Sequence, residues 1–216
     1  MPRRLIADVL SAAFQGTMLL WSMRMTKRVY LAGPEVFLPN AREIGAQKRA
    51  ICERHGLIGV FPTDDEPVPD PSTPPTEQGL AISRAMERAM RSCDAMIVNL
   101  TPFRGPSADV GSAYEMGFIR AMGRPIFAYS NDARPYLDRV AAFCAGELRA
   151  RKTGGYEDPD GMAIEPFELC DNLMLAGGVV SAGGCIVIEP APTPLRYISL
   201  VGFERCVERA AALLRS

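Results

Sequence analysis

Residues 95–117 read AMIVNLTPFRGPSADVGSAYEMG, an apolar strand followed by a loop rich in proline and glycine and by an amphipathic helix. In open α/β sheets, the loops after the carboxyl ends of the strands form the crevice that binds ligands. Two carboxylates, Asp109 and Glu115, lie where this loop meets the helix. The stretch therefore predicts a site at the edge of a sheet with two acidic side chains in it.

Strands and helices alternate on both sides of this stretch. Apolar runs predict strands at 28–31, 57–61, 95–100 and 125–129, and apolar residues at helical spacing predict helices at 40–55, 77–93 and 109–122. This alternation is typical of right-handed crossovers and a parallel sheet. The proline-rich segment 62–76 is predicted to be a long loop on the ligand side of that sheet.

The pattern is weaker in the second half of the chain. It predicts helices at 136–151, 166–175 and 203–214, a polar glycine-rich turn through Gly161 and an edge strand at 185–188. Glycines at positions 177, 178, 183 and 184 interrupt the pattern between the last two of these helices.

Length and composition limit what the chain can be. Its 216 residues, 48% of them hydrophobic, suffice for one α/β domain, which we place at residues 25–216. Residues 1–24 resemble a leader peptide only poorly, so we interpret them as peripheral or as an artefact of the chosen start site. With 24 basic and 25 acidic residues, the chain has no overall field that would attract nucleic acid or a membrane. A small-molecule ligand fits this balance better.

The cysteines and the single histidine also restrict the function. The six cysteines show no C-x-x-C spacing, which indicates reduced thiols and predicts a cytoplasmic protein. Because His55 is the only histidine, a histidine-rich metal site is excluded, and we expect no metal. His55 precedes a predicted helix-terminating glycine, where its positive form suits the helix dipole, so it is interpreted as structural.

Asp109 and Glu115 have structural interpretations as well as functional ones. Ser112 and Glu115 match the S-x-x-E capping box, in which the glutamate accepts a hydrogen bond from the N-cap amide. Asp109 fits a plain N-cap at the start of a helix whose first turn favours negative charge. Helix caps are common, so neither residue alone establishes chemistry.

The surroundings of Glu115 favour a functional interpretation. Gly111 and Gly117 flank the glutamate and leave room for a ligand, while Tyr30 and Gly33 lie at the end of the neighbouring predicted strand. A tyrosine hydroxyl beside a carboxylate can hold and tune a nucleophile. Two carboxylates near a sugar can divide the work of cleaving a glycosidic bond.

Seven segments in this order resemble the nucleoside 2-deoxyribosyltransferase family. They are Val29-Tyr-Leu-Ala-Gly-Pro34, Phe61-Pro-Thr-Asp64, Ser92-Cys-Asp-Ala95, Asn99-Leu-Thr-Pro-Phe-Arg-Gly105, Asp109-Val-Gly111, Glu115-Met-Gly117 and Asp171-Asn-Leu-Met174. The resemblance runs from about Val29 to Leu175. The glutamate motif and the late Asn-Leu-Met are together fairly specific, whereas the Tyr-Leu-Ala-Gly-Pro element is shared with wider relatives.

The resemblance implies a role for each of the matching positions. Glu115 would be the nucleophile that attacks C1′ and forms a covalent 2-deoxyribosyl enzyme, Tyr30 would orient it, and Asp109 would bind the sugar 5′-hydroxyl. Asn172 and Met174 would reach into the site of a neighbouring subunit, which implies at least a homodimer with shared active sites.

Further positions are expected near the base. The resemblance places Gly33, Phe37 and Asp64 there, and we expect Gly111 to line the site because it gives the ligand room. Arg104, in a Gly-Pro loop, either contacts the base or braces the loop. Met86 is a departure, because some family members carry a carboxylate or amide there that is thought to help protonate the leaving base. Here another group would supply that proton, such as one in the acidic loop 64–66, or base exchange is slow or selective.

We therefore predict a single α/β domain with a flavodoxin-like, doubly wound parallel sheet that transfers 2-deoxyribose between nucleobases with retention, without a cofactor. Its partners would be deoxynucleosides and free nucleobases. One alternative is an N-glycosidase of 2′-deoxynucleoside 5′-monophosphates, although a carboxylate at position 109 would repel a phosphate. The other is a non-catalytic nucleotide-sensing module, which would not need a nucleophile at position 115.

Overall fold

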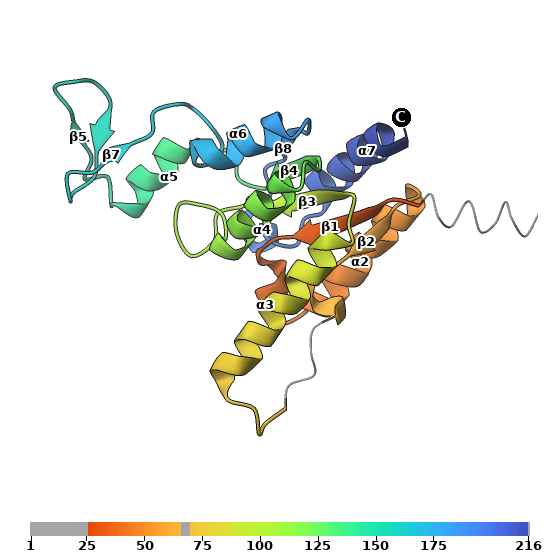
Figure 1. The fold of residues 1–216 in the computed structure, drawn as a ribbon. Coiled ribbons are helices and arrows are strands. Elements are labelled where there is room, and N and C mark those ends of the chain that lie inside the picture. Colours follow the sequence, from red (N-terminus) through yellow and green to blue (C-terminus); the bar gives the residue numbers. More distant parts are fainter. Residues whose placement is uncertain (1–25, 66–69, 216) are drawn as a thin grey trace, which may run out of the picture.

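The computed structural model describes residues 26–65 and 70–215. The predictions for residues 1–24 and for Glu66 lie outside these ranges. The centre of the molecule is a five-stranded parallel sheet in the order β2-β1-β3-β4-β8. This order with helices on both faces is that of a flavodoxin-like doubly wound fold, which confirms the predicted fold class (Figure 1).

The described residues between Arg28 and Ser130 follow the predicted alternation closely. The strands of the sheet are β1 (Arg28–Ala32), β2 (Ile58–Val60), β3 (Ala95–Asn99), β4 (Ile126–Ser130) and β8 (Ile186–Ile188). The helices are α2 (Ala41–Arg54), α3 (Pro75–Arg91), α4 (Val110–Ala121), α5 (Tyr136–Phe143), α6 (Leu173–Ser181) and α7 (Val201–Arg215), with short 3-10 helices η1 (Pro34–Phe37), η2 (Pro62–Asp65) and η3 (Thr193–Leu195).

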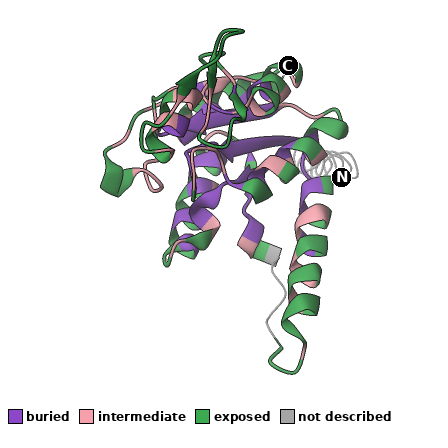
Figure 2. Cartoon of the chain, turned by 90° about the vertical axis from the view of Figure 1, so that its left-hand side faces the viewer, coloured by how far each residue is buried: buried purple, intermediate pink, exposed green. Residues whose placement is uncertain are grey.

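Two hydrophobic cores cover the two faces of the sheet. Side chains of a strand alternate between the faces, so Val29 and Leu31 of β1 pack with residues of α2 and α7. Tyr30 and Ala32 point to the other face, which α3, α4 and α6 cover. Figure 2 shows the buried residues concentrated along the strands and the inner faces of the helices. The central strands β1, β3 and β4 are buried on both faces, as is usual for parallel sheets, whereas Ile58 of β2 and Ile188 of β8 are exposed at the edges.

Two predictions for the second half are wrong, and a third is incomplete. The helix expected at 136–151 ends at Phe143, because the chain turns at Ala145 and Gly146, which both have positive φ. The expected glycine-rich segment through Gly161 does turn, but it also contains a small antiparallel sheet of β5 (Arg149–Ala150), β6 (Tyr156–Glu157) and β7 (Ala163–Ile164). The helix expected at 166–175 begins only at Leu173.

Helix α6 continues through two glycines that were expected to interrupt the pattern. The Asn172 side chain caps its first turn, and Gly177 and Gly178 lie within it. Glycine lowers helix propensity, but burial of Ala176 and Val179 against the sheet overrides this preference. The edge strand at 186–188 and the last helix are confirmed, with α7 starting two residues before the predicted position.

The small antiparallel sheet projects from the body of the molecule beyond α5 and is mostly exposed (Figures 1 and 2). Within residues 26–65 and 70–215, no helix is long and apolar enough to cross a membrane.

Candidate active site

Glu115 and Tyr30 form a close pair although 85 residues separate them in the chain. Glu115 lies in the second turn of α4, and Tyr30 is a fully buried residue of β1. The Tyr30 hydroxyl donates a hydrogen bond to Glu115 Oε1 at 2.6 Å. The strand thus fixes the position of a carboxylate that the helix supplies.

The helix cap is Asp109, and the capping-box interpretation of Glu115 is wrong. Asp109 Oδ2 accepts hydrogen bonds from the Ser112 amide at 2.9 Å and from the Ser112 hydroxyl at 3.1 Å. Because α4 starts at Val110 and not after Ser112, Glu115 lies beyond the first turn, and its carboxylate bonds to Tyr30. Asp109 therefore satisfies the helix N-terminus and leaves Glu115 free for another role.

The environment of Glu115 changes its acidity. Burial raises the pKa of the Glu115 carboxyl from its ordinary 4.5 to about 7, the hydrogen bond from Tyr30 opposes this rise, and the negative charge of Asp109 adds to it. Burial and the adjacent Glu115 raise the pKa of Tyr30 far above its ordinary value, so the tyrosine remains a proton donor to the carboxylate. A strongly shifted carboxyl in a cavity is typical of functional sites.

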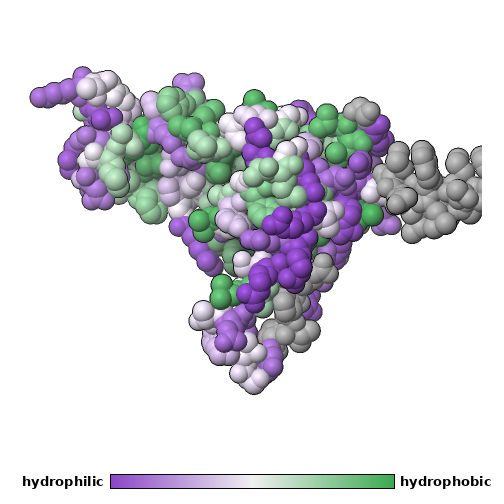
Figure 3. Space-filling model, viewed as in Figure 1, coloured by the Kyte–Doolittle hydropathy of each residue, from purple (hydrophilic) through white to green (hydrophobic). Residues whose placement is uncertain are grey.

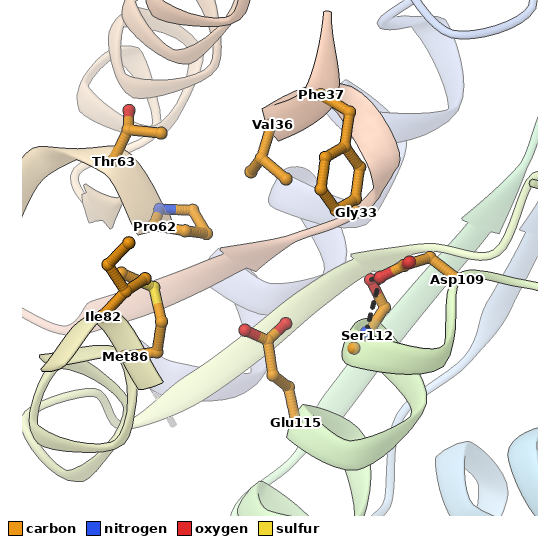
Figure 4. Close-up of a pocket in the computed structure, with 11 residues that line it drawn as sticks. Gly33, Val36, Phe37, Pro62, Thr63, Ile82, Met86, Asp109, Ser112 and Glu115 are labelled. Carbon is orange, nitrogen blue, oxygen red and sulfur yellow. Dashed lines mark hydrogen bonds between the residues drawn. The ribbon is translucent and has the colours of Figure 1, made fainter. Parts of the chain in front are cut away.

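Glu115 faces a cavity of about 370 Å³ at the carboxyl edge of the sheet (Figure 4). Its wall comes from η1, η2, α3 and the start of α4, and the lining residues are Gly33, Val36, Phe37, Pro62, Thr63, Ile82, Met86, Asp109, Gly111, Ser112 and Glu115. Apolar side chains form one side, and the carboxylates of Asp109 and Glu115 extend into the cavity from the opposite side, at the start of α4. Such a mixture suits a ligand with an apolar ring and a polar, hydroxylated part.

The structure brings most of the predicted site residues to this cavity. Besides Glu115 and Asp109, the cavity is lined by Gly33, Phe37 and Gly111. Tyr30 does not line the cavity itself, but its hydroxyl bonds to Glu115, which does, and lies 3.5 Å from the sulfur of Met86.

Two predicted residues lie beside the cavity and do not line it. Asp64 forms an ion pair with Arg49 and accepts a hydrogen bond from the Phe61 amide at 2.9 Å, so it braces the turn next to Thr63. The guanidinium of Arg104 lies 5.0 Å from the centre of the Phe37 ring. Arg104 thus reaches the site through an aromatic side chain that does line the cavity.

Arg104 belongs to a stack of side chains at the rim. The rings of Phe37 and Phe103 are nearly parallel, with centres 5.2 Å apart, and the Arg104 guanidinium is 4.6 Å from the Phe103 ring. Phe103 contacts Tyr197 edge to face, and the Tyr197 hydroxyl donates to the Pro102 carbonyl at 2.6 Å. The stack joins the loop after β3 to η1, so Arg104 braces the rim whatever else it contacts.

Asn172 and Met174 do not line the Glu115 cavity of their own chain. Asn172 Oδ1 accepts from the Met174 amide at 3.0 Å, and its Nδ2 donates to Glu165 at 2.6 Å. The Met174 side chain is 72% exposed. Both residues line or adjoin a separate hollow between α4 and α6.

The sequence analysis missed a buried polar cluster beneath the site. The Glu35 Oε1 atom accepts hydrogen bonds from Lys48 Nζ at 2.6 Å, from Asn99 Nδ2 at 3.0 Å and from the Tyr129 hydroxyl at 2.6 Å. All four side chains are fully buried. Lys48 on the apolar face of helix 41–54, among isoleucines, was the available signal.

This cluster explains why residue 33 is glycine. A Cβ at Gly33 would lie 2.1 Å from Glu35 Oε2 and 2.8 Å from the Asn99 side chain, and its φ of +151° disfavours other residues. Glu35 cannot move away easily because Lys48 and Tyr129 hold it. Glycine at position 33 therefore allows the backbone beside the cavity to pack directly against the buried Glu35 carboxylate.

A second buried ion pair holds the loop before α4. Asp171 accepts hydrogen bonds from the Ser107 hydroxyl and from the Ala108 amide, and it pairs with Arg139 of α5 at 3.2 Å. These contacts fix the segment that ends at Asp109. In the part of the chain that the structure describes, no three His, Cys, Asp or Glu side chains are grouped so as to hold a metal ion.

Comparison with known families matches the model described as nucleoside 2-deoxyribosyltransferase to residues 29–174. The chain belongs to this family. The matched range runs from β1 to the start of α6 and includes Tyr30, Asp109 and Glu115. Family membership supports deoxyribosyl transfer or N-glycosidase chemistry.

Individual relatives agree with this assignment. This chain is 33% identical over 170 residues to an uncharacterized protein of Schizosaccharomyces pombe. The alignment covers 74% of this chain and 81% of that protein. The chain is 31% identical to a 2-desoxiribosyltransferase from Leishmania mexicana, with a TM-score of 0.50 and coverage of 69% of this chain and 85% of that one. A conserved protein from Enterococcus faecalis, 17% identical, shares the fold with a TM-score of 0.52 over 86% of this chain and 99% of that one.

Proposed function

We propose that this protein transfers 2-deoxyribose between nucleobases through a covalent 2-deoxyribosyl intermediate on Glu115. The observation that carries the proposal is the 2.6 Å hydrogen bond from Tyr30 to Glu115 on the floor of a cavity with an apolar wall. A sensing module has no need of a buried, costly carboxylate held in this way. Family membership and the similarity to the L. mexicana enzyme support the same chemistry.

The reaction would proceed in two displacements. The Glu115 carboxylate attacks C1′, the bond between C1′ and the base nitrogen breaks, and the base leaves with the electron pair and takes up a proton. A second base then attacks C1′, loses its proton and releases Glu115 as carboxylate. Two inversions give net retention. Water in place of the second base gives hydrolysis.

The walls of the cavity suggest how the substrate lies. Phe37 and the apolar side chains of Val36 and Ile82 suit the faces of a base, whereas the carboxylate of Asp109 suits the 5′-hydroxyl. Glycines at positions 33 and 111 leave space for the ligand on either side. Met86 presents a thioether, so the proton for the leaving base does not come from residue 86.

Replacement of Glu115 by Gln tests the nucleophile. An amide accepts the Tyr30 hydrogen bond but cannot form the glycosyl ester, so Glu115→Gln should lower transfer from deoxyinosine to adenine by about a thousandfold or more. The exposed Glu43→Gln on α2 is the matched control and should retain full activity. Mass spectrometry of the wild type with a slow substrate should find the 2-deoxyribosyl adduct on Glu115. An active Gln variant together with an unmodified Glu115 would refute the assignment.

Asp109 distinguishes nucleosides from their 5′-monophosphates. One carboxylate oxygen of Asp109 caps α4, and the side chain lines the cavity, where it would repel a phosphate dianion. We therefore expect the wild type to prefer free 5′-hydroxyls. Asp109→Ser, which keeps an N-capping oxygen, should weaken use of deoxynucleosides and improve cleavage of monophosphates. Wild-type cleavage of monophosphates in preference to nucleosides would favour the N-glycosidase alternative.

We further propose that the active form is at least a dimer in which Asn172 and Met174 complete a partner's site. Leu173 and Met174 are exposed apolar residues at the start of α6, beside the hollow between α4 and α6. Figure 3 shows hydrophobic residues gathered over the region of α5 and α6. A patch of this kind marks an interaction surface in a protein that forms oligomers.

A further inference from the structure

A groove lined by arginines lies beside the loop after β3. It consists of two adjoining hollows of about 280 and 450 Å³, and both are lined by Arg134 and Arg196. Arg139 lines the smaller hollow, and no acidic residue does. The larger hollow contains one acid, Asp132.

Arg139 is the buried member of this set. Its side chain is about 1% exposed, and its Nη2 group contacts the Cys170 carbonyl and the carboxylate of Asp171. Its Nε and Nη1 groups are buried and have no hydrogen-bond partner among the described residues. Unpaired buried N–H groups cost free energy, so they are unusual unless a ligand satisfies them.

The other two arginines also retain unused donors. Arg134 binds Asp132 through Nε and Nη2, which leaves its Nη1 group without a bond to that acid. The Nε atom of Arg196 is buried without a hydrogen bond to any residue that the structure describes, and its guanidinium lies 4.8 Å from the centre of the Tyr197 ring. The nearby acids are already engaged: Asp132 by Arg134, and Asp171 by Arg139, Ser107 and two backbone amides. Asp138 on α5 is the remaining acid that acts on Arg134.

This groove shares no lining residue with the Glu115 cavity. The loop after β3 separates the two: Pro102, Gly105 and Pro106 line the groove, while Phe103 contacts Phe37 of the cavity wall. An anion in the groove would therefore be a ligand in addition to the one that Glu115 acts on.

We propose that Arg134, Arg139 and Arg196 form a second binding site, for a phosphate group. Guanidinium groups match the oxygens of phosphate with paired N–H donors, and all three arginines line this groove with a positive charge. The volume leaves room for more than the phosphate itself, so both inorganic phosphate and a phosphate monoester fit. The proposal does not depend on the reaction proposed for Glu115.

Calorimetric titration with inorganic phosphate, at an ionic strength held constant with sodium chloride, tests the site. We expect saturable binding that Arg134→Gln and Arg196→Gln each weaken by about tenfold and that the double variant abolishes. Arg42→Gln, an exposed arginine on α2, is the control and should change the affinity less than about twofold. A parallel titration with 2-deoxyribose 5-phosphate identifies the source: tighter binding that needs the same arginines indicates a monoester, and equal binding indicates inorganic phosphate.

Thermal unfolding without phosphate checks that the variants are folded. If Arg196→Gln is unfolded, Arg196→Lys replaces it, because lysine keeps the charge but lacks the planar fork and should still weaken binding. Absence of saturable phosphate binding, or the same affinity in the folded double variant, would overturn the proposal. So would an equal loss in Arg42→Gln, because it would show only a general effect of charge.

Discussion

At the scale of single residues, the pKa of Glu115 reflects opposing influences. Burial raises it to about 7, the Tyr30 hydrogen bond lowers it and the charge of Asp109 raises it. Because a nucleophilic carboxylate must be ionised, the fraction of active enzyme should increase with pH through about 7. Removal of the Tyr30 hydroxyl and removal of the Asp109 charge should therefore shift the pKa of Glu115 in opposite directions.

We expect kcat/KM for a deoxynucleoside to fall by about tenfold per pH unit below about 7. Tyr30→Phe removes the hydrogen bond that lowers the pKa of Glu115, so it should move this acid limb to higher pH. Asp109→Asn removes a negative charge, so it should move the limb to lower pH. Measurement of kcat/KM from pH 5 to pH 9 checks both signs.

The conservative substitution Tyr114→Phe provides a control for this experiment. Tyr114 is an exposed residue of α4 whose hydroxyl bonds to Glu87. Its replacement by Phe should leave the acid limb of the pH profile unchanged. Shifts of Tyr30→Phe and Asp109→Asn in the same direction would show that Glu115 is not the group that titrates.

At the scale of elements, one buried carboxylate connects four segments of the sheet edge. Glu35 in η1 binds Lys48 of α2, Asn99 of β3 and Tyr129 of β4. The ammonium of Lys48 also lies 5.0 Å from the Phe203 ring of α7. The cluster thereby fixes η1, whose residues form part of the cavity wall.

Replacement of Lys48 by Met should destabilise the fold by about 3–5 kcal/mol, because it leaves the Glu35 charge buried without its counter-ion. Denaturant unfolding at pH 7 measures this loss. Lys152→Met, at an exposed lysine in the turn between β5 and β6, should change stability by less than about 0.5 kcal/mol.

The double variant Glu35→Gln with Lys48→Met removes both charges and should recover most of the lost stability, because the amide oxygen still accepts from Tyr129. A double variant no more stable than Lys48→Met would show that packing of the lysine stem, and not its charge, carries the effect.

At the scale of the whole molecule, the question is whether one chain forms a complete site. Neither Asn172, the half-buried N-cap of α6, nor the exposed Met174 lines the Glu115 cavity of its own chain. A site completed in trans makes activity depend on association, so dilution below the dimer dissociation constant should lower specific activity.

Mixing two inactive variants tests the shared site directly. Glu115→Gln and Asn172→Ala are expected to be nearly inactive alone, and mixed oligomers contain some sites with neither substitution, so activity should return after subunit exchange. The control mixes Glu115→Gln with Glu115→Ala. Every site in these mixed oligomers lacks Glu115, so no activity should return. Lack of recovery despite proven exchange would mean that Asn172 serves its own chain.

The sequence by itself determined the parallel sheet. Continuous apolar runs indicate buried strands, and apolar residues at helical spacing indicate helices, so each element can be predicted from its own residues. The sequence also placed Asp109, Glu115, Tyr30, Gly33 and Gly111 at the carboxyl edge of the sheet, since those residues end or follow predicted strands, whereas Phe37 was expected there only through the family resemblance. The second half was less predictable, because short strands such as β5 and β6 and the late start of α6 depend on local turns and on the Asn172 cap.

Only the tertiary structure decided which partner each polar group takes. The sequence allowed Glu115 to cap a helix or to serve as nucleophile, and the fold settled the cap in favour of Asp109 by starting α4 at Val110. The partners of Glu35 and Arg139 lie on elements up to 94 residues away. Burial and hydrogen bonding of such groups depend on packing between distant segments, which no local sequence pattern records.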